Sequence, residues 1–152
     1  MEERVLLRRQ WSVASELGQE KTVMRAIAGL LAETRLSAAR VDEIETAVSE
    51  AVLNAIEHGN GCDKNVYVNV TLVVRADRCT VNVCDRGFGI SLDLESALPP
   101  QAKDRIHSDN PRGWGLSLIK AFADSVRIVR CDGGSCLEMV FFEDDAMGRV
   151  RH

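Results

Sequence analysis

Long apolar runs are absent from this sequence. No segment approaches the ~20 apolar residues that a membrane-spanning helix needs, and residues 1–13 lack the apolar stretch of a secretory signal peptide. Basic residues are not in excess either, because 19 Lys and Arg are outnumbered by 23 Asp and Glu, for a formal charge of -4. Such a chain has no general attraction for nucleic acid or anionic lipid. We therefore expect a cytoplasmic protein that binds neither nucleic acid nor a membrane directly.

Cysteine motifs are also missing. The five cysteines are odd in number and include no C-x-x-C pair, which argues against a disulfide framework and against a zinc ribbon. We expect reduced, mostly buried side chains that pack as small apolar groups. These residues are Cys62, Cys79, Cys84, Cys131 and Cys136.

What is present suits one compact domain. The chain has 152 residues, of which 45% are hydrophobic and 28% charged, an ordinary globular balance. It contains no internal repeat and no low-complexity segment. We expect a single domain over residues 1–143 and a polar tail over residues 144–152.

Hydrophobic spacing predicts the order of the elements. Apolar residues at helical intervals indicate helices, the first with Ser12 or Ser15 as N-cap and the second beginning near Ser37 and ending before Gly59-Asn60-Gly61. Runs of β-branched residues indicate strands. The expected strands are 4–13, 65–74, 79–84, 125–130 and 135–142, and the expected helices are 15–31, 37–58 and 114–123.

Hairpin-linked strands with helices grouped between them favour an α+β fold. We expect a two-layer sandwich in which a mixed, mostly antiparallel sheet is covered on one face by helices. A doubly wound parallel sheet fits this order less well. Residues 91–112 are polar, contain all three prolines and are longer than most connections, so they predict a lid-like loop.

The second predicted helix carries a pair of polar residues with chemical potential. Glu50 and Asn54 are four residues apart, so their side chains share one face of the helix with Cβ atoms about 5–6 Å apart. An Asn oxygen suits Mg²⁺, which takes few protein ligands and completes its shell with water and phosphate. A carboxylate at Glu50 can accept a proton from an attacking hydroxyl. Taken alone, the pair is better explained as two solvated helix residues.

Two glycine motifs follow. Asp85-Arg86-Gly87-Phe88-Gly89 comes after a buried strand, and its glycines allow a backbone path that leaves the Asp85 carboxylate available to accept a hydrogen bond from the exocyclic amine of adenine. Gly113-Trp114-Gly115 opens a helix, where backbone N–H groups favour phosphate. Alone, the first motif reads as a common turn and the second as a flexible helix entry.

Order and spacing connect these segments. Asn54 precedes Asp85 by 31 residues (85 minus 54), and Asp85 precedes Gly113 by 28 (113 minus 85). This arrangement resembles the N, G1 and G2 boxes of the histidine kinase-like (Bergerat, GHKL) ATPases, which include histidine kinases and gyrase. Residues 49–59, SEAVLNAIEHG, are most similar to the N-box of the anti-sigma factor serine/threonine kinases. The resemblance covers nearly the whole chain, and no Walker-A motif offers a different phosphate site.

The resemblance implies a cofactor, ATP with Mg²⁺, and a role for each matched residue. Glu50 is the expected general base, Asn54 the expected magnesium ligand, and Asp85 the expected adenine acceptor. The glycines of the second and third boxes would shape the nucleotide pocket and the lid hinges; they are Gly87, Gly89, Gly113 and Gly115.

Other residues near these boxes have less definite roles. Arg112 adjoins Gly113 and is expected to neutralise phosphate charge, whereas Lys103 and Arg105 fit solvated lid residues equally well. His58 is placed well at a helix C-terminus by the helix dipole alone. Trp114 is compatible either with packing under the lid or with a partner contact.

The resemblance also implies a function. It predicts a kinase that phosphorylates a STAS-type anti-anti-sigma protein, sequesters a sigma factor and forms a homodimer in a partner-switching system. The alternative is a regulator that holds ATP and a partner without transferring phosphate. The catalytic domain of a histidine kinase is disfavoured, because no histidine-bearing helical segment precedes residue 15.

Overall fold

The computed structural model describes residues 4–86, 115–131 and 133–143. The predicted lid over 91–112 and the predicted tail over 144–152 lie outside the described residues. Within the described part, no helix is both long enough and apolar enough to cross a membrane.

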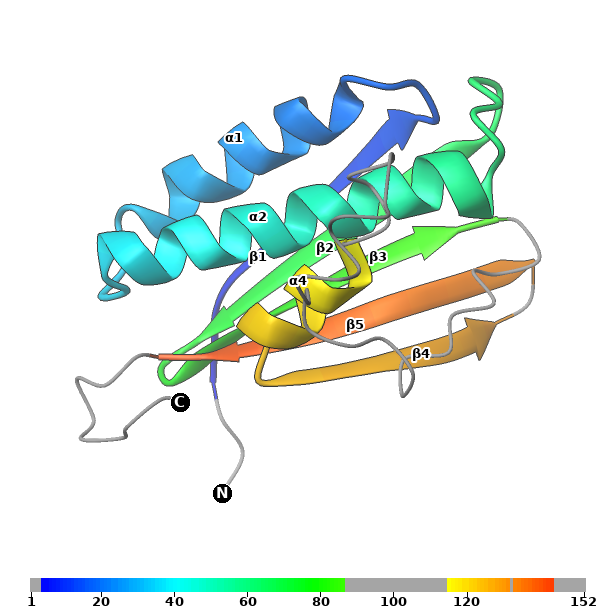
Figure 1. The fold of residues 1–152 in the computed structure, drawn as a ribbon. Helices are drawn as coiled ribbons and strands as arrows, with labels where there is room; N and C mark the ends of the chain where they lie inside the picture. The colour runs from blue at the N-terminus through cyan, green and yellow to red at the C-terminus, as the bar shows by residue number, and fades with distance from the viewer. Residues whose placement is uncertain (1–3, 87–114, 132, 144–152) are drawn as a thin grey trace, which may run out of the picture.

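A five-stranded sheet forms one layer of the described fold (Figure 1). Its strands lie in the order β1-β2-β3-β5-β4, and each of the four pairings is antiparallel. The strands are β1 (Val5–Ala14), β2 (Tyr67–Arg75), β3 (Arg78–Asp85), β4 (Ser125–Cys131) and β5 (Gly134–Phe142). The predicted α+β sandwich is confirmed, and every expected strand is present within two residues of its expected bounds.

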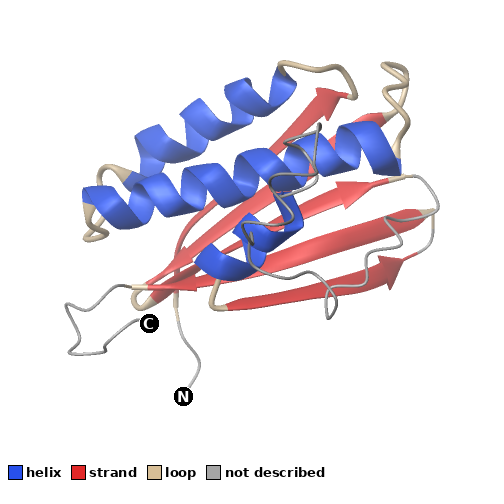
Figure 2. Ribbon diagram, viewed as in Figure 1, coloured by secondary structure: helices blue, strands red, loops and turns tan. Residues whose placement is uncertain are grey.

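Side chains alternate across the sheet because successive residues of a strand point to opposite faces. In β2, Val68, Val70 and Leu72 are fully buried on the face covered by the helices, whereas the residues between them are half-buried. Figure 2 shows all the described helices on that one face. The other face of the sheet is open as far as the described residues extend.

Three α-helices form the second layer: α1 (Gln19–Leu31), α2 (Ala38–Asn54) and α4 (Gly115–Phe122). The central helix, α2, packs against both α1 and α4. Ser37 caps it, because its side chain accepts a hydrogen bond from the Arg40 backbone N–H at 3.0 Å. Its inward face is formed by the buried side chains of Val41, Ile44, Ala47, Val48, Ala51 and Val52.

The start of α1 differs from the expectation. Gly18, with a φ of 106°, is the N-cap and makes no side-chain cap, so neither Ser12 nor Ser15 caps this helix. The Ser15 hydroxyl instead donates to the Val66 carbonyl at 2.5 Å. The Ser15 side chain therefore bonds a residue 51 positions away in the sequence and does not cap the first turn of α1.

A buried arginine joins the helical layer to the sheet near the start of α2. Arg40 is only 1% exposed, and its guanidinium donates to the carbonyls of Phe142 and Phe122, at 3.1 and 2.8 Å. It also pairs with the carboxylates of Glu43 and Asp124. One side chain thus connects α2 with the end of α4 and the end of β5.

The expectation that all cysteines are reduced is wrong for one pair. Cys84 in β3 and Cys136 in β5 face each other directly in the sheet and form a disulfide, with a sequence separation of 52. Strand pairing, rather than local spacing, brings them together. Cys79 matches the expectation as a buried free thiol, and burial raises its pKa to about 12 despite the opposing charge of Arg40. Cys62 is free and exposed.

Candidate functional site

The expected magnesium ligand and general base lie at the C-terminal end of α2. Asn54 is the last residue of this helix and is 4% exposed, while Glu50, one turn earlier on the same face, is half-buried. Among the described residues, no hydrogen-bond partner of the Asn54 amide is found. Buried amides almost always have a partner, so a buried amide without one indicates a site where a ligand or ion supplies it.

The helix continues past Asn54 with a wider turn. Residues Ala55–Gly59 form a π-helix, η1, where the sequence predicted an uninterrupted α-helix. The Asn60 N–H donates to the Ala55 carbonyl at 2.8 Å, and the Cys62 N–H donates to the Ile56 carbonyl at 2.7 Å. Single π-turns are rare and occur often at functional sites. His58 is exposed on this turn.

The π-turn contacts the end of β3, where the expected adenine acceptor is found. Asp85 is 5% exposed, and its side chain packs directly against Gly59. A Cβ added at Gly59 would lie 2.5 Å from Cγ and Oδ2 of Asp85, well inside van der Waals contact. Gly59 thus brings the helix end close to the Asp85 carboxylate, a reason for glycine that goes beyond ending the helix.

Asn60 fixes the backbone immediately after Asp85. Its Oδ1 accepts a hydrogen bond from the Arg86 N–H at 2.9 Å, and its Nδ2 donates to the Ser15 hydroxyl at 2.9 Å. A longer contact of 3.4 Å joins Nδ2 to the Tyr67 carbonyl. The buried Asn60 amide therefore links the ends of η1, β1 and β3 with the start of β2.

The start of β5 holds Asp85 from the other side. Ser135, which is 3% exposed, lies directly opposite Asp85 in the β3–β5 pairing. A Cβ added at Gly134 would lie 1.9 Å from the Asp85 carbonyl oxygen, so only glycine permits this approach. Asp85 is thus enclosed by small residues from two elements.

The structure brings the first two motifs together but describes only part of the third. Gly115 is the first residue of α4, which packs beside α2. Gly87, Gly89, Arg112, Gly113 and Trp114, and the lid candidates Lys103 and Arg105, lie outside the described residues.

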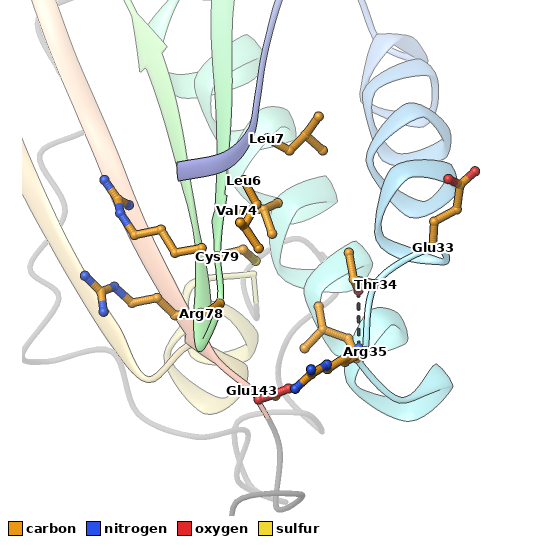
Figure 3. Close-up of a pocket in the computed structure, with 12 residues that line it drawn as sticks. Leu6, Leu7, Glu33, Thr34, Arg35, Val74, Arg78, Cys79 and Glu143 are labelled. Carbon is orange, nitrogen blue, oxygen red and sulfur yellow. Dashed lines mark hydrogen bonds between the residues drawn. The ribbon is translucent and has the colours of Figure 1, made fainter. Parts of the chain in front are cut away.

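A separate cavity of about 490 Å³ opens at the far end of the sheet, away from Asp85 (Figure 3). It lies between β1, the β2–β3 turn and the segment after α1, and Leu7, Val74 and the Cys79 thiol line it. Arg35 and Glu143 point toward each other at its rim. None of the expected site residues lines this cavity, so we do not assign it to the nucleotide.

Comparison with known proteins identifies the family. The profile described as "Histidine kinase-like ATPase domain" matches residues 13–141. "Anti-sigma F factor" of Pasteuria penetrans is 32% identical over 117 residues, covering 76% of this chain and 77% of that protein. The protein of the same name from Bacillus subtilis is 35% identical over 117 residues, covering 75% and 77%. The chain belongs to the anti-sigma factor family of histidine kinase-like ATPases.

A solved structure supports the fold of this anti-sigma-type ATPase domain. The crystal structure of the RsbU and RsbW domains of Rv1364c from Mycobacterium tuberculosis superposes with a TM-score of 0.63 at 22% identity. The match covers 89% of this chain and 32% of that one. The two-layer arrangement of helices on an antiparallel sheet is therefore shared with an experimentally determined protein.

The described residues of this ATPase domain fit Mg²⁺ and an adenine nucleotide. The Asn54 amide supplies a neutral oxygen, and the described part contains no cluster of three or more His, Cys, Asp or Glu that would hold a metal by protein ligands alone. That combination suits Mg²⁺, which keeps waters and phosphate oxygens in its shell. The buried Asp85 carboxylate suits an amine donor.

Sequence reasoning missed two residues of the candidate site. The sequence indicates Asn60 only as part of the segment that ends the helix, and Gly134 only as part of the link between the expected strands 125–130 and 135–142. An amide that can donate and accept, placed between two glycines at a helix end, is a signal for a bridging role at Asn60. The role of Gly134 depends on the approach of β5 to β3, for which the sequence has no local signal.

Proposed function

We propose that this chain is an ATP-dependent anti-sigma factor kinase. Its substrate is a serine or threonine of a STAS-type anti-anti-sigma protein, and its second partner is a sigma factor, which it sequesters in the cytoplasm. The names of the related anti-sigma F factors support a sigma factor as a partner. We also propose a homodimer, for which β1, at the edge of the described sheet with Val5 and Leu6 exposed, offers a surface.

The observation that carries the proposal is the buried Asn54 amide, which has no hydrogen-bond partner among the described residues and lies one helical turn from a half-buried carboxylate. Asn54 would hold Mg²⁺, which when bound neutralises charge on the β- and γ-phosphates. Glu50 would accept the proton of the attacking hydroxyl. The Asn54 amide alone would support only nucleotide binding. The neighbouring Glu50 carboxylate, as a general base, extends the proposal to phosphoryl transfer.

Asp85 would select the base. Its carboxylate accepts the exocyclic amine hydrogen of adenine, which guanine does not present at that position. Gly59 leaves space beside the carboxylate, Gly134 leaves space beside the Asp85 backbone carbonyl, and Asn60 fixes the next peptide. The enclosure of Asp85 therefore favours ATP over GTP.

Single-turnover phosphoryl transfer from γ-labelled Mg-ATP to a purified STAS-type protein from the same organism tests the proposal. Glu50→Gln keeps the size of the side chain but removes its basicity, so ATP affinity should survive while the transfer rate falls. General bases contribute about 10²–10⁴-fold. We expect the lower end of that range, because a loose phosphoryl-transfer transition state needs little early assistance from a base.

Glu45→Gln is the matched control, because Glu45 is another half-buried carboxylate of α2 but is five residues from Glu50 and so on a different face. It should transfer phosphate at the unmutated rate. Transfer by Glu50→Gln at the unmutated rate would remove Glu50 from catalysis. ATP binding with no transfer to any STAS-type partner would replace the kinase by a regulator that only binds.

A further inference from the structure

The disulfide is placed where other molecules can reach it. Cys84 and Cys136 lie opposite each other on β3 and β5, and both are half-buried. Their neighbours Val83 and Leu137 point into the core, so the two sulfurs are on the open face of the sheet. Thiol–disulfide exchange requires access of a thiolate to a sulfur, and no described helix covers this face (Figure 2).

The two free cysteines that the structure describes are less suited to such exchange. Cys79 is 1% exposed on the helix-covered face, and burial raises the pKa of its thiol to about 12, so little thiolate forms at neutral pH. Cys62 is exposed in the turn after η1 as a single free thiol. Among the cysteines whose side chains the structure describes, the facing pair on β3 and β5 is therefore the one suited to reversible oxidation.

The same pair adjoins the residues that position Asp85. Cys84 immediately precedes Asp85, and Cys136 immediately follows Ser135, which lies opposite Asp85 in the sheet. The backbone of Gly134, two residues before Cys136, contacts the Asp85 carbonyl. The covalent link thus joins the strand that carries the proposed adenine acceptor to the strand whose first residues pack against it.

We propose that Cys84 and Cys136 form a reversible thiol–disulfide modification site whose oxidation state sets the affinity for adenine nucleotide. The affinity part of this inference rests on the proposed function of Asp85. The reductant is a dithiol: one of its thiolates attacks a sulfur of the disulfide, and its second thiol resolves the mixed disulfide. The S–S bond of the protein breaks, two electrons and two protons go to the Cys84 and Cys136 thiols, and the dithiol becomes a disulfide.

The oxidised form binds nucleotide more tightly. The cross-link limits the separation of β3 and β5 directly beside Asp85. Binding of the adenine base therefore costs less conformational entropy at these strand ends. Reduction removes this restraint while the strand hydrogen bonds and the core remain. The expected effect is a weakening of about fivefold, at the lower end of usual couplings between sites.

The test measures the dissociation constant of ADP by calorimetry in the full chain, oxidised with a small disulfide or reduced with dithiothreitol. A Cys62→Ser background prevents cross-linking between molecules through the exposed thiol. Non-reducing peptide mapping verifies the Cys84–Cys136 link. The matched control is Cys84→Ser/Cys136→Ser in the same background. Because it cannot form the disulfide, it should bind ADP with the affinity of the reduced protein under both conditions.

The outcomes separate this inference from the proposed function. Equal ADP affinity in the oxidised and reduced protein, or no Cys84–Cys136 link after oxidation, overturns the inference and leaves the nucleotide site standing. If neither form binds ADP, the proposed function fails. Hydrogen exchange at the backbone amides of Asp85 and Arg86 then tests whether the disulfide restrains the end of β3. Faster exchange after reduction supports this restraint, and unchanged exchange overturns it.

Discussion

At the scale of single residues, the candidate site depends on small side chains as much as on charged ones. Asp85 has its position because Gly59 leaves space beside its carboxylate and Gly134 leaves space beside its backbone carbonyl. Neither glycine binds a ligand through a side chain. The residues that permit the geometry are thus distinct from those that would do the chemistry.

Asn60 gives a prediction at this scale. Asn60→Ala removes the acceptor of the Arg86 N–H, so the peptide after Asp85 loses its anchor and the dissociation constant of ADP should rise about tenfold, which corresponds to about 1.4 kcal/mol. Calorimetry measures the affinity, and thermal unfolding measures the stability of the same variant. A buried hydrogen-bonding group left without its partner costs about 1–3 kcal/mol, so the variant remains folded only with reduced stability.

Ser15→Ala is the comparison that separates positioning from general loss of stability. It removes the hydroxyl that accepts from Asn60 Nδ2 but leaves the bond from the Arg86 N–H to Asn60 Oδ1. We expect a similar loss of stability with nearly unchanged ADP affinity. Equal weakening of ADP binding by both variants would show that Asn60 has no specific positioning role.

At the scale of elements, local sequence predicted the helices and strands well because their hydrophobic spacing is regular. It also identified Ser37 as the start of α2, since this cap is made within one turn. It failed where partners are distant in the chain: Ser15 bonds Val66 instead of capping α1, and Cys84 meets Cys136 through strand pairing. The π-turn before Asn60 also has no periodic signal.

In the candidate site too, local features could be predicted from the sequence, whereas contacts between distant segments could not. Glu50 and Asn54 could be predicted as a pair because helical geometry alone places them on one face. The enclosure of Asp85 by Gly59 and Gly134 could not, because it depends on how η1 and β5 approach β3. The order and spacing of the three boxes predicted a set of candidate residues, which stays a prediction, but gave no indication of what holds them in position.

The connection between α2, α4 and β5 through Arg40 gives the prediction for the elements. Arg40→Ala removes a buried guanidinium that donates to the Asp124 carboxylate and to two backbone carbonyls, so the free energy of unfolding should fall by about 3–5 kcal/mol. Urea denaturation measures this. Arg127→Ala, which removes the exposed pair with Glu138, is the control and should cost less than about 1 kcal/mol. Similar losses in the two variants would contradict the structural role given to Arg40.

At the scale of the whole molecule, the disulfide closes a long loop. Its two cysteines are 52 residues apart, and a cross-link of this span reduces the conformational freedom of the unfolded chain. Reduction should therefore lower the free energy of unfolding by about 2–4 kcal/mol, measured in guanidinium with and without dithiothreitol. The Cys84→Ser/Cys136→Ser variant should not respond to the reductant. An unchanged unfolding midpoint on reduction would contradict this expectation.

The place of β1 in the sheet has a consequence for folding during synthesis on the ribosome. This strand is synthesised before the other described strands, yet its only described strand neighbour is β2, with Val5 opposite Arg75 and Ala14 opposite Tyr67. Both helices α1 and α2 are translated between the two strands. The nascent chain therefore carries β1 without its β2 partner until residue 75 has left the exit tunnel, and during that time a chaperone that acts on the emerging chain could bind this unpaired strand.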